Sequence, residues 1–227
     1  MLSSSNVLQY QEGGSIRVWG ERGGVVEMAK RESAKESLKE ILMIGYDKEI
    51  LDPALFAASN KNFGDNVKVL LDGRFTNTRN KFSCGVIRQC FMMSLKKNHF
   101  SVSQAFISSK IDMDEAWNGK RPIVQAVKSG NILILRKMID AGVDLSAQEM
   151  DGQNAVDMAA KQGNPDIIRV LKEGGATFNS TTLGTAIEYG HEEVMRMIRE
   201  MGVNMDVRDA QGNTALMSAI IGGRENL

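Results

Sequence analysis

A repeated spacing of small residues constrains the fold of this chain more than any other feature of its sequence. An alanine stands four residues before a glycine at four places, namely Ala126–Gly130, Ala159–Gly163, Ala186–Gly190 and Ala219–Gly223. The marker glycines follow one another at steps of 33, 27 and 33 residues. A period of this length is typical of repeat proteins, in which each unit packs only against its neighbours.

The same period extends toward the N-terminus in a weaker form. Counting 33 residues back from Gly130 reaches Lys97, and a further 35 residues back reaches Asn62. Apolar segments of helical length flank both positions. A still weaker copy centres on Ser33. We therefore expect repeats from residue 25 to residue 227, the last of the chain.

Each unit of the period reads as two short helices joined by a glycine. A small residue such as Ala126 allows one helix pair to lie close to the next, and apolar residues such as Ile134 fill the space between pairs. A second glycine follows a marker glycine by 12 residues at Gly142, Gly175 and Gly202. At these places a helix is expected to end, and the backbone there commonly needs a positive φ. The sequence therefore predicts an all-α solenoid of stacked helix pairs.

Each unit has about 33 residues, with a glycine turn, a first helix that contains a Thr-Ala pair, and a second helix that follows Gly-His. Such a unit resembles the ankyrin repeat. The best matching segments are 151–175, 185–202 and 211–216. Asn164-Pro165 fits a helix start, with a capping Asn and Pro at the first helical position. The resemblance covers residues 50–227, with a weaker extension to residue 25. It implies an all-α ankyrin-repeat solenoid with short β-turn fingers, in five to six divergent repeats of which the last is incomplete.

The domain organisation follows from where the period begins and where it breaks. Residues 1–24 do not fit the period, so we expect a non-repeat N-terminal segment or cap there and an ankyrin-repeat domain over residues 25–227. Ser15–Trp19 alternate in polarity like a short strand. The short step of 27 residues has lost residues around 176–181, which predicts a gap in the row of fingers. The last unit stops before its second helix, so we expect the repeats to continue beyond this chain, the alternative being an imperfect cap at its end.

The charge balance and the cysteine content limit the classes of partner and compartment. The chain has 28 Lys and Arg against 28 Asp and Glu, so no global positive field would draw it to nucleic acid or to an anionic membrane. No apolar run reaches the roughly 18 residues that a membrane-spanning helix needs. Cys84 and Cys90 are too few for a disulfide framework, which favours a reducing compartment. We expect a cytoplasmic protein, or one inside a host cell if it is a pathogen effector, since divergent ankyrin repeats also occur in such effectors.

No combination of residues indicates catalysis, a metal site or a cofactor. His99 and His191 are the two histidines, too few for a His-based metal site or catalytic triad. By the resemblance, His191 after Gly190 holds a turn together by hydrogen bonds. Cys90 falls in an apolar helix position and is expected in the core. The sequence therefore predicts a non-enzymatic protein without a cofactor.

The resemblance places partner contacts on the finger tips and on the exposed ends of the first helices. Carried over to this sequence, the partner-binding positions are Glu115, Trp117, Asn118 and Lys120 in one finger, Gln148, Met150, Asp151 and Gln153 in the next, Arg208 in the last, and Lys61, Lys96, Lys128, Lys161, Glu188 and Tyr189 at helix ends. Trp117 and Met150 stand at tips where polar residues are usual, and side chains of these types often anchor interfaces. Trp117 could instead fold back on its own finger.

A charged stripe is the second candidate feature. Four lysines recur at the same helix position, namely Lys61, Lys96, Lys128 and Lys161. They could meet an acidic partner segment or simply form a solvated face. We expect an interaction module that binds an acidic or mixed-charge protein or peptide on its concave finger and helix face.

Two alternatives remain open at the level of the sequence. One is a recruiting or regulatory arm of a larger enzyme or pathogen effector whose catalytic domain lies outside this chain. The other is an assembly role, in which the last unit stacks on another chain. The oligomeric state stays open as well.

Overall fold

The computed structural model describes residues 8–12, 15–19, 23–32, 34–42, 48–72 and 82–202, together with Gly212, Thr214, Met217 and Ile220. The chain divides into two compact units. Unit 1 comprises Met1–Ser94 with Ser101–Ser109, and unit 2 comprises Leu95–Phe100 with Lys110–Leu227. Each unit is built mainly of paired helices around buried apolar side chains.

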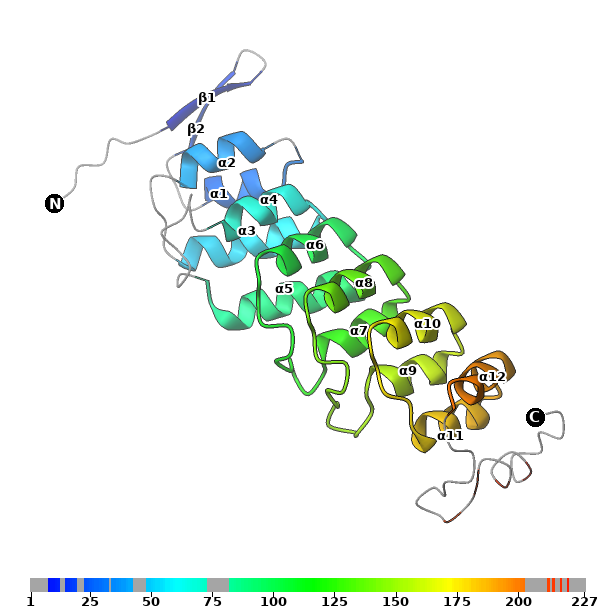
Figure 1. The fold of residues 1–227 in the computed structure, drawn as a ribbon. Helices are drawn as coiled ribbons and strands as arrows, with labels where there is room; N and C mark the ends of the chain where they lie inside the picture. The colour runs from blue at the N-terminus through cyan, green and yellow to red at the C-terminus, as the bar shows by residue number, and fades with distance from the viewer. Residues whose placement is uncertain are drawn as a thin grey trace. The chain divides into compact units, whose positions relative to one another are not determined.

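Unit 1 begins with a two-stranded hairpin and continues with helices. The elements are β1 (Leu8–Glu12), β2 (Ser15–Trp19), α1 (Gly23–Ala29), α2 (Lys35–Leu42), α3 (Lys48–Asn60), α4 (Gly64–Leu71), α5 (Cys84–Lys96) and α6 (Phe100–Ser108), of which the end of α5 and the first residue of α6 belong to unit 2. β1 and β2 pair in antiparallel register, which confirms the strand predicted at Ser15–Trp19. α1 packs on α3 and α2 packs on α4 (Figure 1). First helices therefore stack on first helices, and second helices on second helices.

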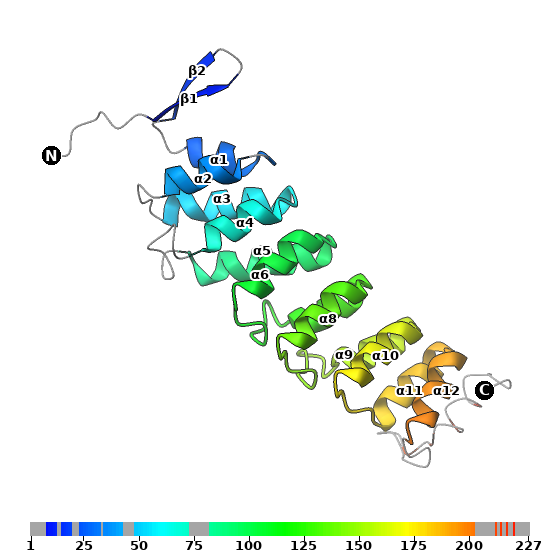
Figure 2. The same cartoon turned by 45° about the horizontal axis from the view of Figure 1, so that its top comes forward.

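Unit 2 repeats this arrangement. Its helices are α7 (Pro122–Ser129), α8 (Ile132–Asp140), α9 (Ala155–Gln162), α10 (Pro165–Glu173), α11 (Ser180–Tyr189) and α12 (Glu192–Glu200). α7, α9 and α11 form one row, and α8, α10 and α12 form the other (Figure 1, Figure 2). The predicted all-α fold of stacked helix pairs is thus confirmed.

Asparagine side chains start most of the helices of unit 2. The side-chain oxygens of Asn131, Asn154, Asn164 and Asn179 each accept a hydrogen bond from backbone N–H groups in the first turn that follows. These N–H groups have no partner within the helix, so each cap stabilises its helix by about 1 kcal/mol. Asn164 is followed by Pro165 at the first helical position, which confirms the helix start predicted there.

Glycines in the left-handed region end the second helices, as predicted. The φ angles of Gly142, Gly175 and Gly202 are 83°, 85° and 78°. In the degenerate repeat, which α5 and α6 form, two residues with side chains take this conformation, Asn98 with φ of 59° and Lys110 with φ of 53°. Counting back from Gly130 reaches Lys97, so the turn in this repeat lies one residue later than the period predicts.

The first helices of unit 2 approach closely through alanine. Ala126, Ala159 and Ala186 have no exposed surface, and Ile134 on the second row is 1% exposed. The packing of one helix pair on the next buries these faces, and burial of each large aliphatic side chain contributes about 1.5–3 kcal/mol. A single pair would leave such faces exposed to water.

The row of fingers has the predicted gap. Fingers precede α7 and α9, whereas residues 174–179 alone join α10 to α11. The last repeat, with the candidate residue Arg208, lies outside the described residues apart from the four single positions given above. Among the described helices, none combines the length and apolar character that crossing a lipid bilayer requires.

Lys110→Gly is expected to raise the free energy of unfolding by about 0.5–1 kcal/mol, because glycine adopts a positive φ without steric conflict. Gly142→Ala is the matched control at the corresponding turn of the next repeat. An added Cβ there meets nothing within 4 Å, so its expected loss of about 1 kcal/mol reports backbone strain alone. Urea denaturation measures both values, and a destabilised Lys110→Gly variant would contradict this account.

Candidate functional site

The candidate surface lies in unit 2 and is called the finger face here. It consists of the first finger (residues 112–120), the second finger (residues 144–153) and the C-terminal ends of α7, α9 and α11. Three kinds of group meet on it: an exposed methionine, a buried carboxylate that holds two lysines, and a lysine that lies over a tyrosine ring.

The first finger is a tight two-residue turn. Trp117 and Lys120 form an antiparallel bridge with two backbone hydrogen bonds of 2.9 Å. Asn118 and Gly119 between them have φ of 49° and 73°. Asn-Gly is the residue pair that favours a turn with two positive φ angles, so the local sequence explains this finger.

The second finger closes around its own glycine. The backbone N–H of Glu149 donates to the Gln153 carbonyl at 2.8 Å, and the N–H of Gly152 donates to the Glu149 carbonyl at 3.0 Å. The Asp151 carboxylate accepts from the N–H of Gln153 at 3.2 Å. Met150 stands at the tip and is 90% exposed. The turn therefore holds an apolar side chain in solvent on a constrained backbone.

Met150 lies across the tip of the first finger. A Cβ placed on Gly119 would collide with the sulfur of Met150. Glycine is favoured at position 119 chiefly because its φ is 73°, and a side chain there would also push the exposed Met150 side chain aside.

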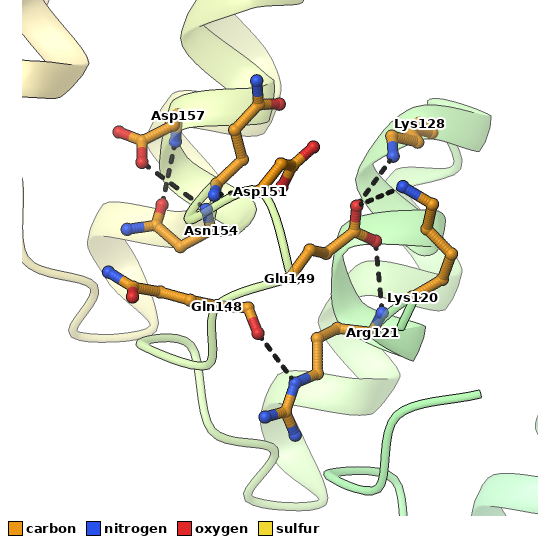
Figure 3. A network of polar contacts seen from close by, with 9 residues as sticks. Lys120, Arg121, Lys128, Gln148, Glu149, Asp151, Asn154 and Asp157 are labelled. Atoms are coloured by element: carbon orange, nitrogen blue, oxygen red, sulfur yellow. Dashed lines mark hydrogen bonds and ion pairs between the residues drawn. The ribbon is translucent and has the colours of Figure 1, made fainter. Parts of the chain in front are cut away.

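Glu149 is the central polar group of the finger face. Its side chain is 1% exposed, and its Oε2 accepts from the Nζ atoms of Lys120 at 3.1 Å and Lys128 at 3.3 Å. Its Oε1 accepts from the backbone N–H of Arg121 at 3.1 Å (Figure 3). A buried carboxylate is costly without such partners. The hydrogen bond to Glu149 and its negative charge raise the pKa of Lys120.

Arg121 and two aspartates fix the fingers to each other. Arg121 Nε donates to the Gln148 carbonyl at 3.0 Å, and its Nη1 donates to the Asp114 carbonyl. The Asp114 carboxylate accepts from the N–H of Asp144 at 2.8 Å. Ser146 donates to the Asp144 carboxylate through its hydroxyl and its backbone N–H, which lowers the pKa of Asp144. The fingers are thus one hydrogen-bonded structure.

A second cluster lies at the ends of α9 and α11. The Nζ of Lys161 is 5.1 Å from the centre of the Tyr189 ring, and the contact with Tyr189 raises the pKa of Lys161. The rings of Tyr189 and His191 are nearly parallel at 11°, with centroids 6.5 Å apart. His191 Nε2 lies 2.9 Å from the Lys161 carbonyl oxygen. The expected role of His191 in holding the turn by hydrogen bonds is confirmed.

The structure places most of the predicted partner-binding residues on the finger face. Glu115, Asn118, Lys120, Gln148, Met150, Asp151, Glu188 and Tyr189 are exposed, and Trp117, Lys128, Gln153 and Lys161 are partly exposed. Lys96 is exposed at the end of α5 in unit 2, whereas Lys61 is exposed in unit 1. Within unit 2, Lys120 and Lys128 share Glu149, and Lys161 lies over Tyr189.

Sequence reasoning missed Glu149 and Arg121. The available signal was the alternation of inward and outward side chains, because neighbouring residues of an extended segment point in opposite directions. With Met150 exposed at the tip, Glu149 had to point inward, toward whatever donors the preceding repeat supplies.

The cysteines and other chelating groups form no reactive centre in the described residues. Cys84 is exposed and Cys90 is buried, and burial raises the pKa of the Cys90 thiol to about 12. Cys90 therefore lies in the core, as predicted. In the described part of the chain, no three His, Cys, Asp or Glu side chains are grouped as metal ligands.

Comparison with known proteins identifies the repeats. A family model for ankyrin repeats, in three copies, matches residues 54–182 and 156–227. The ankyrin repeat domain-containing protein SAT10 of Stachybotrys chartarum is 28% identical over 137 residues, which cover 58% of this chain and 7% of that protein. The E3 ubiquitin-protein ligase hecd-1 of Caenorhabditis elegans is 28% identical over 104 residues, 44% of this chain and 4% of the relative.

A third relative is also named as an enzyme. The L-asparaginase of Dirofilaria immitis is 26% identical over 110 residues, which cover 46% of this chain and 19% of that protein. The matched region spans less than a fifth of the length of each of these three relatives.

Lys128→Met is expected to lower the free energy of unfolding by about 1–2 kcal/mol, because the buried Glu149 carboxylate loses one of its two ammonium partners. Lys137→Met, the same substitution at an exposed position of α8, is the control and is expected to change stability by less than about 0.5 kcal/mol. Urea denaturation of both variants distinguishes the two positions. Equal stability would mean that the ion pair adds nothing.

Proposed function

This chain belongs to the ankyrin-repeat family, whose helix stacks are generally non-catalytic interaction modules, and we propose that it binds a partner protein or peptide on its finger face. Met150 is the observation that carries this proposal. It is 90% exposed, more than Leu133 at 62% or Tyr189 at 42%. An exposed methionine loses contact with water on binding and adapts its shape to an apolar partner group.

Rigidity of the fingers supports the same proposal. The hydrogen bonds of Arg121 and the Glu149 carboxylate order both fingers before a partner arrives. A partner would then lose little binding energy to ordering this surface. The concave finger and helix face expected from the family resemblance is the place where we assign binding.

The charge of the partner follows from the pairing of the lysines. Lys120 and Lys128 share Glu149, and Lys161 lies over Tyr189. Exposed Asp151 and Glu188 stand on the same face. Of the acidic and mixed-charge partners that the lysine stripe suggested, these contacts favour the mixed-charge kind.

A recruiting or regulatory arm of a larger enzyme is the second candidate function. The E3 ubiquitin-protein ligase and the L-asparaginase among the relatives favour it, since each is named as an enzyme and exceeds the matched region several-fold in length. A pathogen effector is a variant of this candidate, and a cytoplasmic or host-cell location remains part of the proposal. Both candidates use the finger face in the same way.

Replacing Trp117 and Met150 together by alanine is expected to weaken partner binding by more than about 2 kcal/mol, roughly 30-fold, because the apolar anchor is lost. A pull-down from cytosolic lysate, read by mass spectrometry, compares this variant with the wild type. Leu133→Ala on α8 is the matched control, because Leu133 is an exposed apolar residue outside the fingers. Proteins retained by the wild type and by Leu133→Ala, but lost from the double variant, identify the partner. Equal recovery from all three would place binding elsewhere.

Salt should change the affinity of a partner captured in this way by less than about threefold between 50 and 300 mM, because apolar contact with Met150, unlike attraction between charges, is not screened by ions. Fluorescence anisotropy with the captured partner measures the dependence. A steady and steep fall would instead favour the acidic partner on the lysine stripe.

A further inference from the structure

Two lysines on the finger face converge on one buried carboxylate, and this arrangement bears on which partners the face accepts. We propose that Glu149 is a specificity-determining residue, an internal counter-ion that occupies Lys120 and Lys128 and keeps acidic segments off the finger face. The inference rests on the proposed function, because it concerns the partner of that same face. It names the partner class as a protein segment without net negative charge that has an apolar side chain to pack on Met150.

Glu149 offsets the positive charge that a competing carboxylate would seek. The Nζ atoms of Lys120 and Lys128 lie 3.1 and 3.3 Å from the same oxygen of Glu149. The second carboxylate oxygen accepts from the N–H of Arg121 at 3.1 Å. An acidic residue of a partner would approach two ammonium groups that already face this negative charge, which weakens their attraction for it. Taking the place of Glu149 would cost that buried carboxylate three hydrogen bonds.

The backbone around Glu149 opposes such a displacement. The N–H of Glu149 is bonded to the Gln153 carbonyl at 2.8 Å, and its carbonyl accepts from Gly152 at 3.0 Å. The preceding residue, Gln148, is held by Arg121 Nε at 3.0 Å. Moving Glu149 outward would therefore disturb the finger that displays Met150.

Carboxylates outnumber lysines on the finger face. Its lysines are Lys120, Lys128 and Lys161, and its carboxylates are Asp112, Asp114, Glu115, Asp144, Glu149, Asp151 and Glu188. The nearby carboxylates raise the pKa of two of the lysines. After Glu149, the charge of Asp151 also raises the pKa of Lys120, and after Tyr189, the charges of Glu188 and Asp151 raise the pKa of Lys161.

The finger face also offers apolar surface to a partner. Met150 is 90% exposed and Tyr189 is 42% exposed. Burial of apolar groups provides binding energy that does not depend on opposite net charge. The matching partner is therefore an apolar segment without net negative charge.

The test uses the full chain and a fluorescein-labelled octaglutamate peptide at low ionic strength, measured by fluorescence anisotropy. Glu149→Gln frees both lysines and is expected to bind the peptide at least about tenfold more tightly than the wild type. Glu188→Gln is the matched control, because it removes one equal charge from the same face without freeing this lysine pair. It is expected to change peptide binding by less than about threefold.

Two results would overturn the proposal. One is wild-type binding of octaglutamate as tight as that of Glu149→Gln. The other is an equal gain in Glu188→Gln, which would reduce the effect to net charge. Circular dichroism checks that Glu149→Gln folds.

A second measurement decides the question if that variant does not fold. Wild-type protein with ¹³C-methyl methionine is titrated with octaglutamate, and the Met150 methyl signal is expected to stay in place. A saturable shift of that signal overturns the proposal. Neither measurement needs the natural partner, so a failure here is distinct from a failure of the Trp117/Met150 pull-down.

Discussion

Burial of the helix faces between successive pairs is the constraint on which the rest of this structure depends. One pair of short helices has too little interior to bury its own apolar residues, so each pair needs the next. In unit 2 the contact between first helices is made by Ala126, Ala159 and Ala186, which are wholly buried. Any larger side chain at these positions would separate the helices and, with them, the fingers that precede α7 and α9.

Polar side chains then fix each repeat on its neighbour. Gln162 donates to the Lys128 carbonyl at 3.1 Å, and the Thr182 hydroxyl donates to the buried Asp157 carboxylate at 2.8 Å. These bonds cross from one helix pair to the next and satisfy groups that would be costly to bury alone. They hold the ends of the first helices in place, and the lysines of the finger face extend from those ends. The electrostatics of that face are thus a consequence of how the repeats stack.

Much of the fold could be predicted because its signals are local. Asn164 and Pro165 mark a helix start, and Gly142 marks a helix end, from their own backbone preferences. The degenerate repeat was harder, because Asn98 and Lys110 take left-handed conformations without glycine. The candidate site was predictable only in part. Exposed positions follow from the repeat register, but the partner of a charge does not.

The sequence by itself determined the period, the helix pairs, the finger gap and the exposed place of Met150, since each depends on residues close together in the chain. The tertiary structure alone decided what the lysines do. Lys120 and Lys128 bind Glu149, which is 29 and 21 residues away in the sequence. Lys161 contacts Tyr189 on the neighbouring helix. Such encounters depend on how far one pair is displaced from the next, a distance that packing sets. Two lysines of the positive stripe in the sequence, Lys128 and Lys161, thereby lie against a carboxylate and a tyrosine ring in the fold.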